Sequence, residues 1–91
     1  MENNTYKKLE RIVRGFSNYR RIQILELLAK KPNLSIFDIS EELDVNFKTI
    51  SAHTSRLLNA GTLLKKEDFT SVRHKLTPRG KAILMFLRTL E

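Results

Sequence analysis

Residues 35–61 read SIFDISEELDVNFKTISAHTSRLLNAG, and this stretch decides the fold. Near its start, Ser35 and Asp38 stand three residues apart, which is the pattern of a capping box. In such a box each side chain accepts a hydrogen bond from the other residue's backbone N–H group at the start of a helix. We therefore predict a helix over 36–43. The apolar residues that share one face of this helix are Ile36, Ile39 and Leu43.

The second part of the stretch predicts another helix after a short turn. The turn is Asp44-Val45-Asn46, and the side chain of Asn46 can cap a helix over 47–60. Gly61 ends that helix, because glycine readily adopts the left-handed backbone that follows many helices. Two short helices joined by a tight turn form a helix-turn-helix unit.

Two helices are predicted before this unit. Over 5–14, apolar residues recur every three to four positions, and Gly15 is expected to end that helix. Ser17 or Asn18 can cap the next helix, which is predicted over 19–30. This second helix is apolar almost all round, so it belongs in the core.

A hairpin and a last helix are predicted after the unit. Residues 63–66 and 72–76 read as two short strands around a polar loop. Thr77 and Pro78 then begin a helix over 79–90. The order predicts a mainly α fold with a small β-hairpin, and the length of the chain, 1–91, fits a single domain.

The charge of the chain favours a nucleic-acid partner. Its 91 residues include 17 Lys and Arg against 10 Asp and Glu, for a net charge of +7. Residues 35–45 contain four acids and no base, whereas 46–60 contain Lys48 and Arg56 and no acid. A positive surface is therefore expected to begin at the second helix of the helix-turn-helix unit.

Several functional classes find no support in the sequence. The chain has no Cys, and its two histidines, His53 and His74, are too far apart in sequence to suggest a metal site. It shows no glycine-rich phosphate loop and no nucleophile–base pair. We therefore expect no metal, no cofactor, no catalytic residue, no enzymatic activity and no domain for a small-molecule ligand. No apolar run reaches the ~20 residues that a membrane helix needs, and no signal peptide is evident, so a cytoplasmic protein is expected.

Three stretches carry a family resemblance: FSNYRRIQILELL at 16–28, VNFKTISAHTSRLLNAG at 45–61 and LTPRG at 76–80. In this order they resemble the winged helix-turn-helix regulators of the arsenic-repressor (ArsR) kind, with MarR-like regulators close behind. The resemblance covers about 9–90. It implies that 47–60 is a recognition helix for DNA and that 63–76 form the wing. The sequence departs from the family at Thr54, where the family usually has Leu.

Helical geometry sorts the side chains of the recognition helix. At ~100° per residue, Ile50, Thr54 and Leu57 point inward, and small or polar side chains point outward. Short outward side chains allow a helix to approach bases closely in the major groove, although the same residues also occur on ordinary solvated surfaces. The predicted DNA-contacting residues are Asn46, Phe47, Lys48, Thr49, Ser51, Ala52, His53, Ser55, Arg56, Lys66, Arg73 and Lys75.

Two groups of arginines have alternative interpretations. Arg73 can reach the minor groove of DNA, or it can pair across the hairpin with Glu67 or Asp68. Arg20 and Arg21 lie at a helix N-terminus, where a cation is unfavourable, so a partner is expected. That partner can be a DNA phosphate or an internal carboxylate.

The terminal helices carry more apolar side chains than a small core can cover, which predicts a homodimer. The predicted interface residues are Tyr6, Leu9, Val13, Ile83, Leu84, Phe86, Leu87 and Leu90. A two-fold protein with one recognition helix per subunit would bind an inverted repeat in double-stranded DNA. We therefore expect a sequence-specific transcriptional regulator that acts as a repressor. The alternatives are a winged-helix protein-interaction module and a non-specific architectural nucleic-acid-binding protein.

Overall fold

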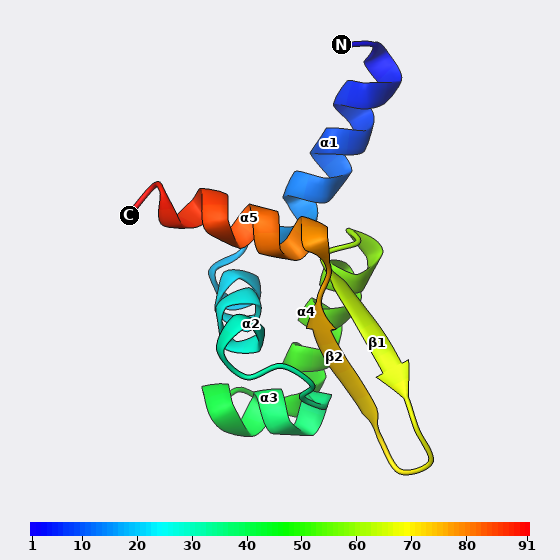
Figure 1. Cartoon of the computed structure of the whole chain (residues 1–91), viewed down its shortest axis with the longest axis vertical. Helices are drawn as coiled ribbons and strands as arrows, with labels where there is room; N and C mark the ends of the chain where they lie inside the picture. Colours follow the sequence, from blue (N-terminus) through cyan, green and yellow to red (C-terminus); the bar gives the residue numbers. More distant parts are fainter.

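The computed structural model describes all residues, 1–91, and has five helices and one two-stranded antiparallel sheet (Figure 1). The predicted fold class is confirmed. The elements are α1 (Asn3–Phe16), α2 (Tyr19–Lys30), α3 (Ile36–Leu43), α4 (Phe47–Asn59), β1 (Leu63–Glu67), β2 (Val72–Leu76) and α5 (Pro78–Arg88). No helix combines the length and the apolar character that crossing a membrane requires.

Side-chain caps fix where the helices begin. At α3 both halves of the capping box form: Asp38 N donates to Ser35 Oγ at 3.0 Å, and Ser35 N donates to Asp38 Oδ2 at 3.1 Å. Asn18 rather than Ser17 caps α2, and its Oδ1 accepts hydrogen bonds from the backbone amides of Arg20 and Arg21. Thr77 caps α5 by accepting from Gly80 N at 3.1 Å.

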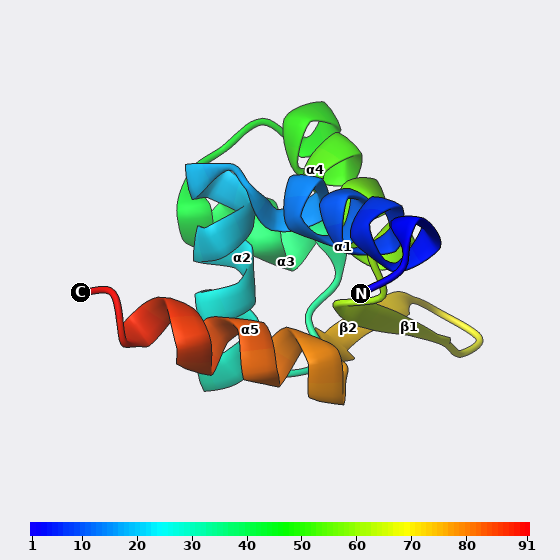
Figure 2. The same cartoon turned by 90° about the horizontal axis from the view of Figure 1, so that it is seen from above.

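The core lies where α2 crosses the other elements, and Figure 2 shows α2 passing between α4 and α5. The prediction that α2 is central is confirmed, because Ile24 and Leu25 are completely buried. Burial of such side chains contributes about 1.5–3 kcal/mol each. The full core cluster is Ile24, Leu25, Leu28, Ile39, Ile50, Leu57, Leu63, Leu76 and Leu84.

The hairpin is joined to the segment between α2 and α3. β1 and β2 pair in antiparallel register from Leu63 opposite Leu76 to Glu67 opposite Val72. On its other edge β2 forms an isolated bridge, in which His74 N donates to the carbonyl oxygen of Leu34 at 2.9 Å. The buried His74 ring also lies 3.0 Å from that oxygen through Nδ1. This contact makes Nδ1 the protonated ring nitrogen, since the carbonyl oxygen can only accept.

The predicted end of the first helix was wrong. α1 continues through Gly15 to Phe16, and Gly15 is its one buried residue. A Cβ at Gly15 would overlap the Cβ of Ala60, so this glycine serves a close approach between α1 and the end of α4. Beyond this contact α1 extends away from the body of the protein, and the N-terminus lies at its far end (Figure 1).

Candidate DNA interface

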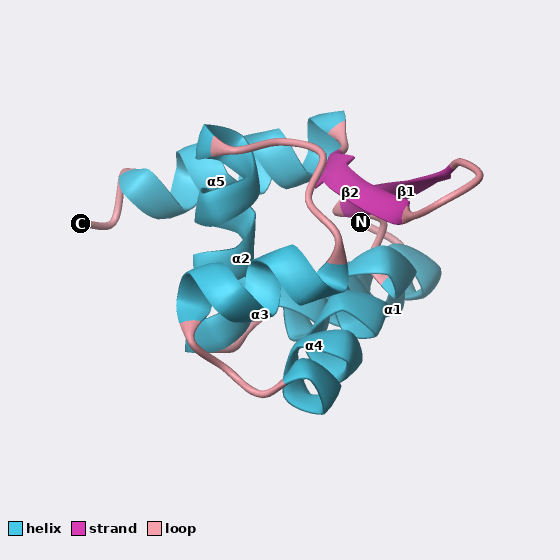
Figure 3. Ribbon diagram, turned by 90° about the horizontal axis from the view of Figure 1, so that it is seen from below, coloured by secondary structure: helices cyan, strands magenta, loops and turns pink.

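The two faces of α4 are sorted as the sequence predicted. Ile50, Thr54 and Leu57 are buried, whereas Lys48 and Ala52 on the opposite face are exposed. Ser55 and Asn59 continue this exposed face along the helix. Seen from the underside of Figure 1, α3 and α4 lie together with the hairpin beside them, and α5 lies at the far edge (Figure 3).

Thr54, the departure from the family pattern, packs in the core without a hydrogen bond. Its side chain is 1% exposed, and its Oγ1 has no hydrogen-bond partner. Thr62, which is equally buried, donates from Oγ1 to the carbonyl oxygen of Leu57 at 2.8 Å. Thr54 is therefore a packing residue of the core whose hydroxyl group is not hydrogen-bonded.

The N-terminus of α4 is less open to phosphate than a free helix end. Asn46 Oδ1 accepts from Lys48 N at 2.8 Å and from Thr49 N at 3.3 Å, so both amides already have a partner. Glu41 and Asp44 line a shallow hollow beside this cap together with Phe47. The start of α4 therefore combines two capped amides with two nearby acidic side chains.

His53 does not lie on the outward face of α4. Its side chain is half-buried. Burial is the main cause that lowers the pKa of His53 below 6.5, and the positive charges of Arg21 and Arg20 lower it further. The neutral form is favoured, so this imidazole offers DNA phosphate less charge than the sequence suggested.

The wing carries three cations on one face. Directly opposite residues in an antiparallel pair share a face, and Lys66 is opposite Arg73. Lys75 lies two residues beyond Arg73 and so joins them, but it lies at the base of the hairpin. No ion pair joins Arg73 to Glu67 or Asp68.

Arg73 is instead held by neutral oxygens. Its Nη1 donates to the carbonyl oxygen of Asn33 at 3.0 Å, and its Nε donates to Ser71 Oγ at 3.2 Å. Asp68 organises the tip by accepting from the backbone amides of Thr70 and Ser71, which lowers the pKa of its carboxyl group. The tip is therefore a hydrogen-bonded turn, and Arg73 links it to the segment between α2 and α3.

Neither arginine at the start of α2 pairs with a carboxylate. Arg20 Nη1 donates to Gln23 Oε1 at 3.0 Å, and its guanidinium lies 5.0 Å from the centre of the Tyr19 ring. Arg21 Nη1 donates to the carbonyl oxygen of Gly15 at 3.4 Å. Arg21 therefore supports the C-terminal end of α1, where a cation is favourable.

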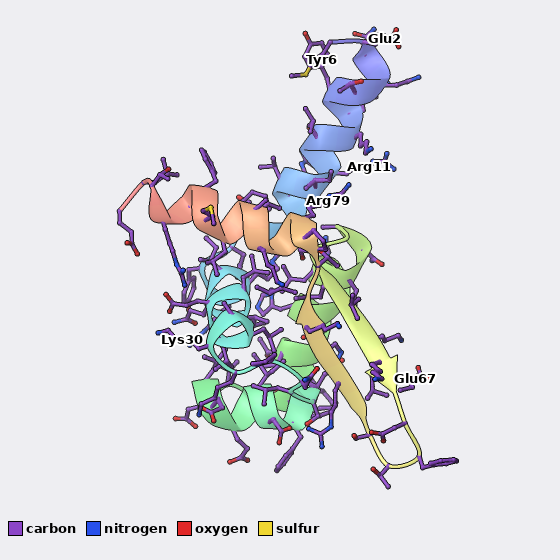
Figure 4. The ribbon with its side chains drawn as sticks, in the orientation of Figure 1. Glu2, Tyr6, Arg11, Lys30, Glu67 and Arg79 are labelled. Atoms are coloured by element: carbon purple, nitrogen blue, oxygen red, sulfur yellow. The ribbon has the colours of Figure 1, made fainter.

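Sequence reasoning missed a basic cluster at the junction of α1, α4 and α5. Arg79 Nη1 donates to the carbonyl oxygen of Ala60 at the end of α4, at a distance of 3.0 Å. Arg11 and Arg79 lie close together at this junction (Figure 4), where they line one hollow with Lys8. Arg56 and Arg14 line the adjoining hollow. The hydrogen bond from Arg79 to Ala60 joins residues 19 positions apart. In the sequence, only the preference of cations for helix C-termini could have suggested it.

The terminal helices leave an apolar surface uncovered. On α1, Tyr6, Leu9 and Val13 are 55%, 40% and 49% exposed, and Figure 4 shows Tyr6 at the outer end of the helix. Phe86 on α5 and Leu90, two residues after its end, are also exposed. The remaining residues predicted for the dimer interface are less accessible: Ile83 and Leu87 are half-buried, and Leu84 lies in the core at 5% exposure.

Solved structures of other proteins share this architecture. HlyU from Vibrio cholerae has a TM-score of 0.82 and 27% sequence identity, covering 99% of this chain and 97% of that one. A homodimeric winged helix-turn-helix DNA-binding domain from Mycobacterium bovis, described as a possible ArsR-family regulator, has a TM-score of 0.87 at 19% identity, covering 99% and 86%. The transcriptional repressor PagR of Bacillus anthracis has a TM-score of 0.82 at 17% identity, covering 94% and 99%.

The last two identities are low, so these structures establish the likeness of fold alone. The predicted resemblance to ArsR-like proteins is confirmed at that level. No curated protein matches the sequence closely enough to assign a relative. Residues 17–63, from the residue before the cap of α2 to the first residue of the wing, match the family described as winged helix-turn-helix DNA-binding. The chain therefore belongs to the winged helix-turn-helix DNA-binding family.

Proposed function

We propose that the protein is a homodimeric transcriptional repressor, which binds an inverted repeat in double-stranded DNA with one α4 helix of each subunit in the major groove. The observation that carries this proposal is the outward face of α4. It has no acidic residue, and apart from Lys48 its side chains are short at the positions that would lie deepest, Ala52 and Ser55. A helix with such a face can approach base edges closely.

The proposed contacts divide into two kinds. Lys48, Ser51, Ala52 and Ser55 are proposed to lie nearest the bases. Lys66 and Arg56 are proposed to contact phosphates, which adds affinity without sequence preference. Asn46, Phe47, Thr49, His53, Arg73 and Lys75 complete the predicted set, with the last three weakened as candidates by the contacts described above.

Dimerisation is supported by the exposed apolar stripe of α1. A helix that buries only a glycine within its own subunit gains little from tertiary packing, and such packing usually stabilises helices in proteins. A second copy that covers Tyr6, Leu9, Val13 and Phe86 would supply that packing for both subunits. The repressor role is supported by the likeness to PagR, and homodimerisation by the likeness to the domain from Mycobacterium bovis.

Selection of bound duplexes from a random DNA pool tests the proposal. We expect an inverted repeat whose half-sites have centres about 10 bp apart, because two recognition helices must meet grooves one helical turn, roughly 34 Å, apart. Recovery of sequences without a consensus, with a steep dependence on salt, would instead indicate an architectural nucleic-acid-binding protein. No binding to any duplex would favour the protein-interaction module.

A single substitution locates the contact surface. Ala52→Glu should abolish binding, since a carboxylate buried against phosphates and base acceptors has no partner there. Ala29→Glu is the matched control, because Ala29 is also exposed but lies on α2. Circular dichroism and the mass of the dimer should be unchanged in both variants. Equal DNA affinity of the two variants would show that α4 does not enter the groove.

A further inference from the structure

A groove opens where α5 crosses the C-terminal end of α2 beside β2, an arrangement that Figure 2 shows from above. It has a volume of about 410 Å³, which lies in the range of sites for small molecules. Its apolar lining is formed by Leu28, Leu76 and Leu84, with Ala29 and Met85 beside them. The three leucines belong to the core cluster, so the base of the groove is rigidly packed.

All the charged residues that line the groove are cations. Lys75 comes from the wing strand, and Lys81 and Arg88 come from α5. No acidic residue lines the groove, and none of the three ion pairs in the molecule involves these side chains. The groove therefore combines an apolar base with positive charge that the protein itself does not neutralise.

We infer that this groove binds a small amphipathic carboxylate, with its apolar tail on the leucines and its carboxylate beside Lys81 and Arg88 of α5. The apolar surface favours a hydrocarbon or aromatic tail, because covering it removes that surface from water. The cations select an anionic head group, since charge-assisted hydrogen bonds to Lys and Arg are the strong ones. A bound carboxylate of this kind would contact both the wing strand and α5.

The same groove disfavours other small molecules. An aliphatic cation would meet like charge with no acid to offset it, and a neutral alcohol would gain only the apolar contacts. Inorganic anions would gain only the exposed electrostatic contacts, which solvent and salt screen. A ligand of this groove therefore needs both an apolar tail and an anionic head group.

Calorimetric titration of the full chain with straight-chain carboxylates tests the inference. Hexanoate, octanoate and decanoate, each below its micelle concentration, should bind once per chain. The affinity should rise about four-fold for each added methylene that the groove covers. Octyltrimethylammonium has the opposite charge and an alkyl tail one carbon longer than that of octanoate, and it should still bind at least about ten-fold more weakly than octanoate.

Variants of the chain test whether octanoate binds in this groove. The double variant Lys81→Gln with Arg88→Gln should bind octanoate at least about ten-fold more weakly. The control variant Lys7→Gln, on the exposed side of α1, should bind octanoate with unchanged affinity. Met85→Trp should also weaken binding by filling the groove, because Met85 is 70% exposed and its replacement leaves the core intact. Circular dichroism should show that each variant is folded.

Three outcomes would overturn the inference. The first is equal affinity for octanoate and octyltrimethylammonium, and the second is undiminished octanoate binding by the double variant. The third is binding to phosphatidylglycerol vesicles without binding of free octanoate, which would assign the basic groove to a lipid surface. All three are measured without DNA, so failure of the proposed DNA recognition would leave this result unaffected.

Discussion

Thr54 and Thr62 allow one physical argument to be tested with the same substitution at two buried sites. Both side chains are at most 1% exposed, but only the hydroxyl of Thr62 has a partner, the carbonyl oxygen of Leu57 at 2.8 Å. Valine has nearly the shape of threonine and replaces the hydroxyl by a methyl group. The two Thr→Val variants therefore differ chiefly in what happens to a hydrogen bond.

We expect Thr54→Val to stabilise the protein. A buried polar group without a partner costs about 1–3 kcal/mol, and valine removes that group while keeping the packing of the methyl groups. Thr62→Val should be destabilising by about 1 kcal/mol, the net value of a typical hydrogen bond. The loss is no larger because the carbonyl oxygen of Leu57 keeps a second hydrogen bond, from Thr62 N at 3.0 Å.

Thermal unfolding followed by circular dichroism measures both effects. In a domain of this size each kcal/mol shifts Tm by about 4–8 °C, so the two variants should move in opposite directions by resolvable amounts. Protein concentration must be equal in all samples, because dimerisation would make Tm depend on concentration. A lower Tm for Thr54→Val would refute the reasoning, since it would mean that the hydroxyl of Thr54 contributes a net favourable interaction.

Three further predictions concern the surface. Val13→Glu or Phe86→Glu should give the mass of a single chain by light scattering at micromolar concentration, and an unchanged dimer would mean that the exposed apolar stripe is not the interface. Lys66→Ala should weaken binding to all duplexes alike and lower the salt slope by about one; a changed consensus would mean base readout. Because folding lowers the pKa of His53 below 6.5, the folded state binds fewer protons than the unfolded chain. Stability should therefore be full above pH 6.5 and fall as pH drops through the lowered pKa; His53→Gln should remove this part of the dependence, and an unchanged pH profile would contradict it.

Local signals in the sequence predicted most of the architecture. The capping box at Ser35 and the cap at Asn46 determine where α3 and α4 begin, and they depend on residues only two or three positions apart. The alternation of buried and exposed positions along α4 followed from helical geometry alone. The structure confirms these features because neighbouring residues decide them.

The errors and omissions involve residues that are distant in sequence. Gly15 was interpreted as a helix end because the same residue type serves both left-handed caps and close approaches, and only the position of Ala60 distinguishes them. For Arg73 the alternative of an acid partner across the hairpin is absent, and its guanidinium instead reaches the carbonyl oxygen of Asn33, 40 positions away. Leu84 was assigned to an interface because a sequence shows that a helix face is apolar and does not show what covers it.

The bridge between Leu34 and His74 has a mechanical consequence. It bonds β2 to the segment that enters α3, on the edge opposite the one that pairs with β1. Backbone hydrogen bonds on both edges of β2 restrain the hairpin at His74 relative to the segment that enters the helix-turn-helix unit. The wing and α4 should therefore approach a duplex as one rigid body. The angle between two subunits would then set the spacing between half-sites. A substitution in α1 or α5 could therefore alter which operators fit, although every DNA-contacting residue would keep its place within its own subunit.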